Sequence, residues 1–566
     1  MHIKMQCTVD GVDDRSILHE LRAQMGSWSP ETIAAMPAPS HDAARIESVS
    51  PIDRGALAAI AATDPADVAV AVAQAAEVQR LWAQLRLSDR ARYLSRAAQA
   101  VIDEWDELVD VIVAEQGRPI AEAQSMELLP AVESLQWLAE EGPRVLAPER
   151  VGLSRALQPV KRARLTFEPL GVVAVLTPGA EPFATPVGDI AIALMGGNGV
   201  VLHPSPLAAL AATRIGRVFV RAGLPEGLLQ VVHGGPQTAR ALVSAPQIAH
   251  VRFTGASPAG RDVGEACARE LKRATIEVGG KDPMLVLADA NLPRAVAGAL
   301  WGAYANAGQS GGSLARAYVL RERYERFTTA VVAGARALRI GHPADAATEI
   351  GPLLAADRAE RLVALIDDAV AAGATLHCGG PVSIDGLAGA YFAPAVLTGV
   401  ARDARLLRED APGPWLAIEP VDSEQEGIAR CNGGVGGLGA SVWTADPHKG
   451  ARIAHEIRAG MVWCNDHLVT RSLPQLPWGA VHGAGIGRAR GAVALRASVE
   501  PKLVTWDPPA GRMPWWHPYD GALVAAWRAL ARMRSLRDSD RGRGWRQGMR
   551  PLARVAWRSL KTVRRR

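Results

Sequence analysis

Residues 171–178 read GVVAVLTP and carry the clearest signal of the fold in the sequence. This stretch is a short run of aliphatic residues that ends at a proline, and similar runs follow at residues 197–205, 228–234 and 250–256. Helical patterns such as residues 205–223 lie between the runs. Because the runs are continuously apolar rather than alternating, they predict buried parallel strands joined by βαβ connections. The sequence therefore predicts an α/β fold.

A second set of apolar runs follows later in the chain. These runs are PMLVLAD, ARAYVL, ASVWTAD and GMVWCND, at residues 283–289, 315–320, 440–446 and 460–466. Each is short and rich in β-branched, aliphatic or aromatic residues, as buried strands are. The sequence therefore predicts a second α/β domain.

Residues 64–141 carry a helical pattern, in which apolar residues recur at three- and four-residue spacing. Asp64, followed by a proline, suits the N-cap of one long helix. A second long helix is predicted from a Ser88 cap to Gly117, a residue type that commonly ends helices. Residues 1–45 show little periodicity and are predicted to be a variable extension.

Charge is distributed unevenly along the chain. The 566 residues include 63 Lys and Arg and 58 Asp and Glu, a net charge of +5. Residues 511–566 hold 15 basic and 3 acidic residues, a net +12, which leaves a net −7 on residues 1–510. The basic character belongs to the tail, which excludes a chain-wide nucleic-acid-binding surface.

The composition indicates a globular protein of a reducing compartment. Hydrophobic residues make up 48% of the chain and charged residues 21%, enough apolar side chains for a large core. The five cysteines show no CxxC pairing, so neither a disulfide framework nor a zinc site is indicated. No apolar leader and no apolar run of about 18 residues is present. We therefore expect a cytoplasmic protein without a metal site.

An ordered series of short motifs connects these elements. After GVVAVLTP come GNGVVLHPS, LPEGLLQVV, FTGA, EVGGKDP, NAGQS, GPL and GIGR, with EQGRP at residues 115–119 before them. The series resembles the aldehyde dehydrogenase superfamily from about residue 50 to residue 504. Any one motif is common, but the whole series in this order is specific.

The resemblance implies an α/β fold with a Rossmann-type dinucleotide-binding domain, an α/β catalytic domain and a small β oligomerisation arm. The segments expected are an N-terminal extension at 1–45, the dinucleotide-binding-like domain at 46–280 with an arm segment near 150–168, the catalytic-like domain at 281–489, an arm strand at 490–505, and a basic Trp- and Arg-rich extension at 506–566.

The family's chemistry starts from a cysteine thiolate that attacks an aldehyde. By resemblance, the nucleophile position here is Gly311, which has no side chain. Ser310 and Ser313 are nearby hydroxyls for which no base partner is identifiable. Cys464 could approach the pocket, but it is interpreted as a buried structural cysteine.

The family's oxyanion hole contains an asparagine amide, and a glutamate activates the hydrolytic water. The asparagine position reads Ala180, and loss of one such donor typically costs roughly 100- to 1000-fold in rate. Gly179 stands where the family has a tryptophan, and Glu181 adds a negative charge nearby. Glu277 stands at the water-activating position. It is interpreted as a residual general base or as a carboxylate kept by its hydrogen bonds.

NAD or NADP is the cofactor that the resemblance implies. His203 and Ser205 stand in the element that holds the adenosine ribose, although the residue that should carry a carboxylate is a proline. Gly255 marks a helix N-terminus suited to pyrophosphate, with alanine after it in place of serine. Asp410 replaces a longer glutamate that fixes the nicotinamide ribose.

The tail beyond residue 506 predicts two helices. In the first, residues 523–536, Leu523, Val524, Trp527 and Leu530 are expected on one side. In the second, basic residues recur every three or four positions beside apolar partners; these are Arg550, Arg554, Arg558, Lys561 and Arg565, with Leu552, Val555, Ala556, Leu560 and Val563. Such a helix suits an anionic membrane surface, an acidic protein, non-specific nucleic acid, or plain solvation.

Three functions follow from these observations. The leading hypothesis is a catalytically degenerate member that acts as a binding or scaffolding subunit, in a homo-oligomer or beside an active paralogue. The alternatives are an NAD(P)-dependent oxidoreductase that acts on a carbonyl by non-covalent chemistry, and a membrane-peripheral adaptor that works through residues 511–566. Specific nucleic-acid binding is not expected.

Overall fold

The computed structural model describes residues 44–153, 161–468, 472–507, 513, 516–517 and 519–561. The chain divides into two compact units. The first, here called the body, is Met1–Ala147 with Phe167–Glu500; the second, here called the arm unit, is Pro148–Thr166 with Pro501–Arg566. The domain boundary near residue 280 lies inside the body and stays a prediction.

A six-stranded sheet forms the first half of the body, with strand order β17-β9-β8-β5-β6-β7. All neighbours are parallel except β17, which pairs antiparallel with β9. The chain runs outward from β5 through β6 to β7 and then returns to β8 on the other side of β5, as in doubly wound folds. The strands are β5 (Val172–Thr177), β6 (Gly199–Pro204), β7 (Leu229–Val231), β8 (Ile248–Gly255), β9 (Arg273–Val278) and β17 (Gly485–Ile486).

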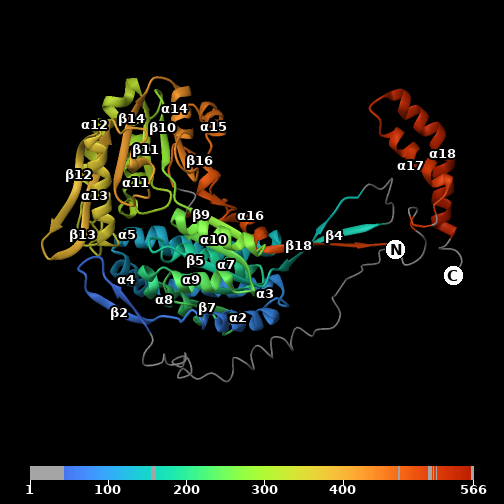
Figure 1. The fold of residues 1–566 in the computed structure, drawn as a ribbon, viewed down its shortest axis with the longest axis horizontal. Helices are drawn as coiled ribbons and strands as arrows, with labels where there is room; N and C mark the ends of the chain where they lie inside the picture. The colour runs from blue at the N-terminus through green and yellow to red at the C-terminus, as the bar shows by residue number, and fades with distance from the viewer. Residues whose placement is uncertain are drawn as a thin grey trace. The chain divides into compact units, whose positions relative to one another are not determined.

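A seven-stranded sheet forms the second half, with order β12-β13-β14-β11-β10-β15-β16. Only β12 is antiparallel to its neighbour. Figure 1 shows these strands as a group separate from β5–β9. They are β10 (Asp282–Val286), β11 (Leu314–Leu320), β12 (Thr375–Ile384), β13 (Leu387–Thr398), β14 (Trp415–Val421), β15 (Gly439–Trp443) and β16 (Met461–Cys464). Both predicted α/β sheets are confirmed.

Both faces of each sheet are buried, because side chains alternate between two core clusters along one strand. In β5, Val173 and Val175 belong to one cluster, whereas Val172 and Ala174 belong to another. In β10, Met284 and Leu285 divide in the same way. Alternation with both faces covered is the reason that these strands read as unbroken apolar runs.

Helices cover the two sheets. The α-helices of the body are α2 (Val68–Trp82), α3 (Leu87–Asp103), α4 (Trp105–Gln116), α5 (Ile120–Glu122), α6 (Leu129–Val145), α7 (Ala184–Met195), α8 (Ala209–Arg221), α9 (Pro236–Ser244), α10 (Ser257–Arg269), α11 (Leu292–Tyr304), α12 (Arg321–Ala337), α13 (Ala356–Ala371), α14 (Glu424–Asn432), α15 (Pro447–Glu456) and α16 (Gly491–Ala497). The shorter 3-10 and π turns are η2 (Ala123–Leu128), η3 (Pro206–Ala208), η4 (Ala305–Gly308), η5 (Arg405–Leu407) and η7 (His482–Ala484), and a two-stranded hairpin is formed by β1 (Arg45–Val49) and β2 (Ala56–Ala61).

The first helices differ in detail from the prediction. Asp64 does not cap α2, because its side chain accepts a hydrogen bond from the backbone N–H of Ala66 within a preceding turn, and the helix begins at Val68. The long second helix is two helices, since the chain bends at Glu104 between α3 and α4. Gly117 does end α4, in the left-handed conformation with φ 62°.

The arm unit contains a three-stranded sheet of order β18-β4-β3. Its strands are β3 (Glu149–Arg150), β4 (Arg162–Pro169) and β18 (Val499–Trp506). The arm strand expected at 490–505 is therefore a strand only from Val499, because residues 491–497 form α16 instead.

Two helices of the arm unit, α17 (Gly521–Met533) and α18 (Asp538–Lys561), confirm the helical tail. They pack on each other through Leu523, Ala526 and Val555. Val524 and Trp527 were expected beside Leu523, but they are exposed, because α18 covers only the Leu523 side. Val563 and Arg565 lie outside the described residues, and the side chains of residues 556 and 558–561 are not described.

Candidate active-site cleft

A cleft of about 530 Å³ lies where the two sheets of the body face each other. Its walls include Pro178, Gly255 and Val278, which end or follow β5, β8 and β9. The opposite wall includes Leu314 and Trp415, which begin β11 and β14. Ligands of doubly wound sheets bind at these carboxyl ends, where the strand order reverses on either side of β5. The cleft is therefore the candidate active site.

Five of the residues selected from the sequence line this cleft together. They are Ala180, Gly255, Glu277, Gly311 and Asp410. They come from five separate segments, so their common location depends on the fold rather than on proximity in the sequence. Ser310 and Ser313 line it as well.

His203 and Ser205 do not line the cleft, although the sequence grouped them with the cofactor contacts. His203 lies in β6, is buried, and has no hydrogen-bond partner at Nε2 among the described atoms. Burial lowers the pKa of His203, so its ring is neutral at physiological pH. Ser205 is the N-cap of η3, and its hydroxyl accepts a hydrogen bond from the Leu207 N–H (3.3 Å).

Gly311 follows a loop whose backbone is fixed by unusual conformations. Asn306, Ala307 and Gly308 are all left-handed, with φ values of 56°, 48° and 67°. A Cβ atom at Gly308 would lie 2.0 Å from the Gly413 carbonyl oxygen, so only glycine fits there. At Gly311, by contrast, a Cβ atom would lie 3.9 Å from Gly279 Cα, an ordinary van der Waals distance. A Cβ atom at position 311 would therefore be accommodated.

A buried polar network holds this loop against the segment that contains Ala180. The Ala180 carbonyl accepts hydrogen bonds from Arg118 Nη2 (2.6 Å) and Asn306 Nδ2 (3.0 Å). The Asn306 N–H in turn donates to Glu122 Oε2 (2.9 Å). Burial raises the pKa of Glu122 to about 7, against the opposing effects of Arg118 and the Asn306 N–H. None of these contacts involves a side chain at position 311.

Arg118 is held in place by Glu127, and both side chains are fully buried. Arg118 Nη2 lies 3.2 Å from Glu127 Oε1. Glu127 Oε2 accepts from the N–H groups of Phe183 (3.0 Å) and Ala184 (2.8 Å) at the start of α7. The pair therefore connects the start of α7 to the backbone of Ala180.

Glu277 lies near the carboxyl end of β9 and is only 8% exposed. In the sheet it is paired with Thr254 of β8 and Gly485 of β17. This position puts a carboxyl group on the cleft wall, close in sequence to the turn at Gly279 that contacts Gly311.

The cleft also contains basic residues that the sequence analysis missed. Its lining includes five basic residues, Arg261, Lys281, Arg358, Arg361 and Arg408, and four acidic residues, Glu181, Glu277, Glu409 and Asp410. The three-residue spacing of Arg358 and Arg361 on α13 is a signal that could have revealed them, because it puts both on one helix face.

Two of these cations are deeply placed. Arg358 donates to Gln309 Oε1 (3.1 Å), and burial lowers its pKa against the effect of Asp410. The Lys281 ammonium lies 4.8 Å from the centre of the Trp415 ring. Burial lowers the pKa of Lys281 to about 8, with Asp410 acting in the opposite direction. A partly desolvated cationic wall attracts anionic ligands.

Cys464 ends β16 and is exposed, so its interpretation as a buried structural cysteine is wrong. The reason is topological: β16 is the edge strand of its sheet. Cys464 does not line the cleft, and neither do Cys267, Cys378 and Cys431, the other described cysteines.

Within the described residues, no group of three His, Cys, Asp or Glu side chains is placed to hold a metal ion. No helix in the same part of the chain is long and apolar enough to span a bilayer.

A doubly wound sheet, a facing parallel sheet and a cleft between them define a two-lobed α/β protein of the dinucleotide-binding class. The family description "Aldehyde dehydrogenase family" matches residues 38–504. The chain belongs to the aldehyde dehydrogenase family.

Curated relatives agree over most of the chain. A 4,4'-diapolycopene aldehyde oxidase of Methylomonas sp is 35% identical over 451 residues, which cover 80% of this chain and 83% of the relative. A betaine aldehyde dehydrogenase of Agrobacterium fabrum is 33% identical over 460 residues, which cover 81% and 92%.

Solved structures give the same assignment. An aldehyde dehydrogenase from Brucella melitensis biovar abortus has a TM-score of 0.79 and 30% identity, covering 83% of this chain and 95% of that one. A structure of the Bacillus cereus aldehyde dehydrogenase in complex with NAD+ has a TM-score of 0.78 and 28% identity, covering 85% and 99%. The expected fold is therefore confirmed, and the expectation of NAD or NADP from resemblance agrees with a relative solved with NAD+.

Proposed function

We propose that this chain is a catalytically silent aldehyde dehydrogenase that keeps the ligand cleft and acts as a binding or scaffolding subunit. One observation carries the proposal: Gly311 stands on the cleft wall at the position that the family resemblance gives to the thiol, and no described cysteine lines the cleft. A thiolate is the group that forms the covalent intermediate. Without it, Glu277 has no thioester to hydrolyse.

The missing side-chain donor at position 180 also supports the silent-subunit proposal. With alanine at position 180, the side chain offers no hydrogen-bond donor to an oxyanion. The backbone around Ala180 is nevertheless fixed, because Arg118 and Asn306 both donate to its carbonyl oxygen. The proposal therefore separates two properties: the scaffold is retained, and the reactive groups are not.

The cleft fits the phosphates of a dinucleotide. Gly255 and Ser257 at the N-terminus of α10 line it, and a 13-residue helix presents N–H groups and a positive dipole end there. Arg358 and Arg361 add guanidinium groups on the facing wall. A nicotinamide bound in the cleft would supply hydride acceptance, while the residues of this chain bind and orient it. His203 and Ser205 lie outside the cleft and are not assigned to this role.

Aldehyde oxidation tests the proposal directly. The wild-type chain is expected to give no aldehyde-dependent formation of NADH or NADPH, and Gly311→Ala is the matched control that adds a Cβ without a thiol. Gly311→Cys should become reactive towards a thiol-directed aldehyde analogue. Adding Ala180→Asn should raise its turnover by roughly 100- to 1000-fold, the usual effect of one oxyanion donor.

The same assay distinguishes the alternative, an oxidoreductase with altered chemistry. Two relatives named as enzymes, an aldehyde oxidase and a betaine aldehyde dehydrogenase, are the reason for testing this alternative. Wild-type turnover that persists when Ser310 and Ser313 are replaced by alanine would favour non-covalent hydride transfer and end the silent-subunit proposal. Saturable NAD or NADP binding, measured by isothermal titration, supports the silent-subunit proposal if no turnover accompanies it.

We also propose that the chain assembles through its arm unit, with a second copy or with an active paralogue. The β18 strand leaves Leu503, Val504 and Trp506 substantially exposed within the arm unit. Apolar side chains of this size along one strand indicate a surface that another chain covers. Light scattering of the full chain should show an oligomer, and Leu503→Lys should shift it towards the monomer. A wild-type monomer at micromolar concentration would remove the assembly proposal.

A membrane-peripheral adaptor is the second candidate, favoured by one feature of the α17–α18 pair. Trp527 of α17 and Trp545 and Trp557 of α18 are exposed by 37%, 61% and 55%. Arg546, Arg550 and Arg554 are exposed on the same helix α18. Exposed tryptophan beside arginine suits the interface of an anionic bilayer.

Vesicle co-sedimentation tests this adaptor role. The full chain should bind vesicles that contain phosphatidylserine, and the triple change of Arg546, Arg550 and Arg554 to Gln should abolish binding. Replacing Arg92, Arg144 and Arg269, three exposed arginines of the body, by Gln removes the same charge and is the matched control. Equal loss in both triple variants would show a general charge effect and contradict the adaptor role.

A further inference from the structure

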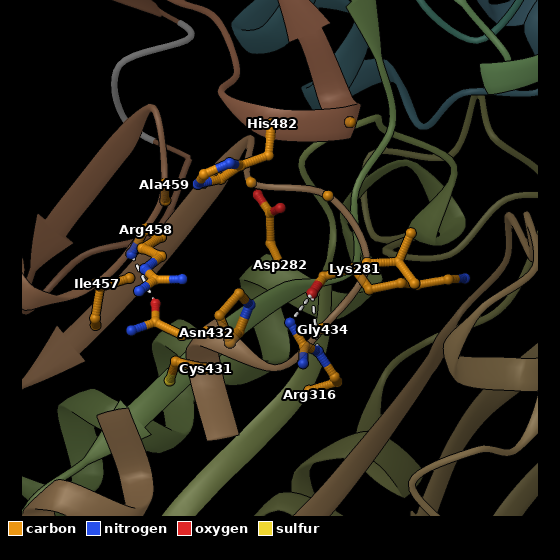
Figure 2. A pocket seen from close by; sticks show the side chains of 16 residues that line it. Lys281, Asp282, Arg316, Cys431, Asn432, Gly434, Ile457, Arg458, Ala459 and His482 are labelled. Atoms are coloured by element: carbon orange, nitrogen blue, oxygen red, sulfur yellow. Dashed lines mark hydrogen bonds between the residues drawn. The ribbon is translucent and has the colours of Figure 1, made fainter. Parts of the chain in front are cut away.

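A second cavity, of about 330 Å³, lies beside the first residue of β10. It is lined by Asp282, by Arg316 of β11, by the glycine-rich segment after α14, and by Arg458 and His482 (Figure 2). It shares Lys281 and Val435 with the active-site cleft and none of its other lining residues. The proposed function assigns this cavity no role.

Asp282 is the unusual member of this cavity. It is only 1% exposed, and its Oδ2 atom has no hydrogen-bond partner among the described atoms. Figure 2 shows its carboxyl group pointing into the pocket, towards the His482 side. A buried carboxyl oxygen without a partner costs free energy unless something bound in the cavity satisfies it.

The charge state of Asp282 decides what it can bind. Burial raises its pKa to about 8, and the nearby Glu277 acts in the same direction, whereas the Gly439 N–H and Arg316 oppose the rise. At neutral pH the carboxyl group therefore keeps its proton and can donate a hydrogen bond into the cavity. Asp282 is the sole acidic residue among the described residues that line it.

The other charges of the cavity are positive. Arg316 is buried, and its guanidinium group donates to the Lys281 carbonyl oxygen from Nε (2.9 Å) and Nη2 (2.7 Å). A Cβ atom at Gly434 would lie 2.2 Å from the Arg316 nitrogens, so this glycine makes room for the guanidinium group. Arg458 and His482 are exposed where the cavity meets solvent. This arrangement disfavours cations and favours an anion.

Two other polar side chains of the cavity are not available to a ligand. The Asn432 amide is already occupied, because it accepts from the Arg458 N–H (2.7 Å) and donates to the Glu456 carbonyl oxygen (2.9 Å). The Cys431 thiol is buried, which raises its pKa to about 12, so it offers no thiolate to a metal. The groups left to hydrogen-bond a ligand are the Asp282 carboxyl and the Arg458 guanidinium group. Arg316 contributes its charge alone, because its Nη1 also donates to the Tyr318 hydroxyl (3.3 Å) and the Arg430 carbonyl oxygen (3.4 Å).

We propose that this cavity binds a small organic carboxylate. A charged oxygen of the ligand accepts a hydrogen bond from the protonated carboxyl group of Asp282 and lies near the positive charges of Arg316 and Arg458. A hydrogen bond to a charged acceptor is short and stronger than one between neutral groups. The cavity volume suits a short-chain acid rather than a nucleotide.

Isothermal titration of the full chain with propionate tests the proposal, with chloride as the control anion. Saturable propionate binding is expected at pH 6.5 and should weaken as the pH rises through about 8, where Asp282 loses its proton. Asp282→Ala removes the donor and should weaken binding by roughly 10- to 100-fold, the typical effect of a hydrogen bond to a charged group. Arg458→Gln should also weaken it, whereas Arg402→Gln, an exposed arginine outside the cavity, should not.

Asp282→Asn keeps an N–H donor and removes the titration. In a Lys281→Met background, this variant should bind propionate with the same affinity from pH 6.5 to pH 9, which tests the role of Asp282 even if the alanine variant fails to fold. The background is needed because Lys281 also lines the cavity and burial lowers its pKa to about 8. The proposal is overturned if the wild-type chain shows no saturable binding at pH 6.5. It is also overturned if Asp282→Asn keeps the pH dependence in this background, or if chloride binds equally well.

Discussion

Replacing Glu127 by Gln should destabilise the body strongly, because it leaves a buried cation without its counter-ion. Glu127 accepts from two backbone N–H groups at the start of α7 and pairs with Arg118, and both side chains are fully buried. The amide of Gln is neutral, and its NH2 group would face either those N–H donors or the guanidinium group. Breaking one partner of a buried ion pair costs about 3–5 kcal/mol. We expect a loss of this size in the free energy of unfolding.

Urea denaturation followed by tryptophan fluorescence measures this change. Glu141→Gln is the matched control, because Glu141 pairs with Arg144 on the surface, where such pairs contribute about 0–1 kcal/mol. The double variant Arg118→Met/Glu127→Gln should recover most of the loss, since it removes both charges and keeps a side-chain carbonyl oxygen for the Phe183 and Ala184 N–H groups. A Glu127→Gln effect below about 1 kcal/mol would refute the reasoning, and so would a double variant less stable than the single one.

Three further predictions concern the loop before position 311 and two titrating groups. Gly308→Ala should destabilise the protein, because its Cβ would lie 2.0 Å from the Gly413 carbonyl oxygen, whereas Gly311→Ala should leave the melting temperature nearly unchanged; equal effects would contradict this. Between about pH 4 and pH 8, only the unfolded state has an ionised Asp282, so the wild type loses stability as the pH rises and Asp282→Asn does not. The stability advantage of Asp282→Asn should therefore grow by about 1.4 kcal/mol per pH unit. A difference in denaturation midpoints that does not change with pH would contradict this prediction. Burial lowers the pKa of His467 to about 4, so folding stability that this neutral histidine supplies should fall as the pH drops from about 6.5 to about 4, and His467→Gln should lessen that fall in thermal melts.

The parts of the fold that could be predicted depend on local signals. Apolar runs such as 172–177 predict buried parallel strands, whereas β9 contains Arg273 and Glu277 and carries no such signal. Helix starts were less predictable. Asp64 carries the side chain of a good N-cap, yet it caps a turn at Ala66, and tertiary packing decides which use prevails.

The candidate site could be predicted only in part, because a motif specifies a turn and not its neighbours. Gly255 ends β8, Glu277 lies one residue before the end of β9, and Gly311 lies in the turn before β11, so their motifs placed them on the cleft wall. His203 likewise lies one residue before the end of a strand, β6, but it lies outside the cleft lining. Arg358 comes from a helix distant in sequence, and its approach to Gln309 depends on the packing of the whole second sheet.

The Asn306–Gly308 loop also bears on how such a protein can evolve. Its left-handed backbone and its hydrogen bonds to Glu122 and Ala180 involve no atom of the side chain at position 311. The folding of the loop therefore does not depend on the side chain at position 311, and a small side chain introduced there by one substitution is expected to need no compensating change.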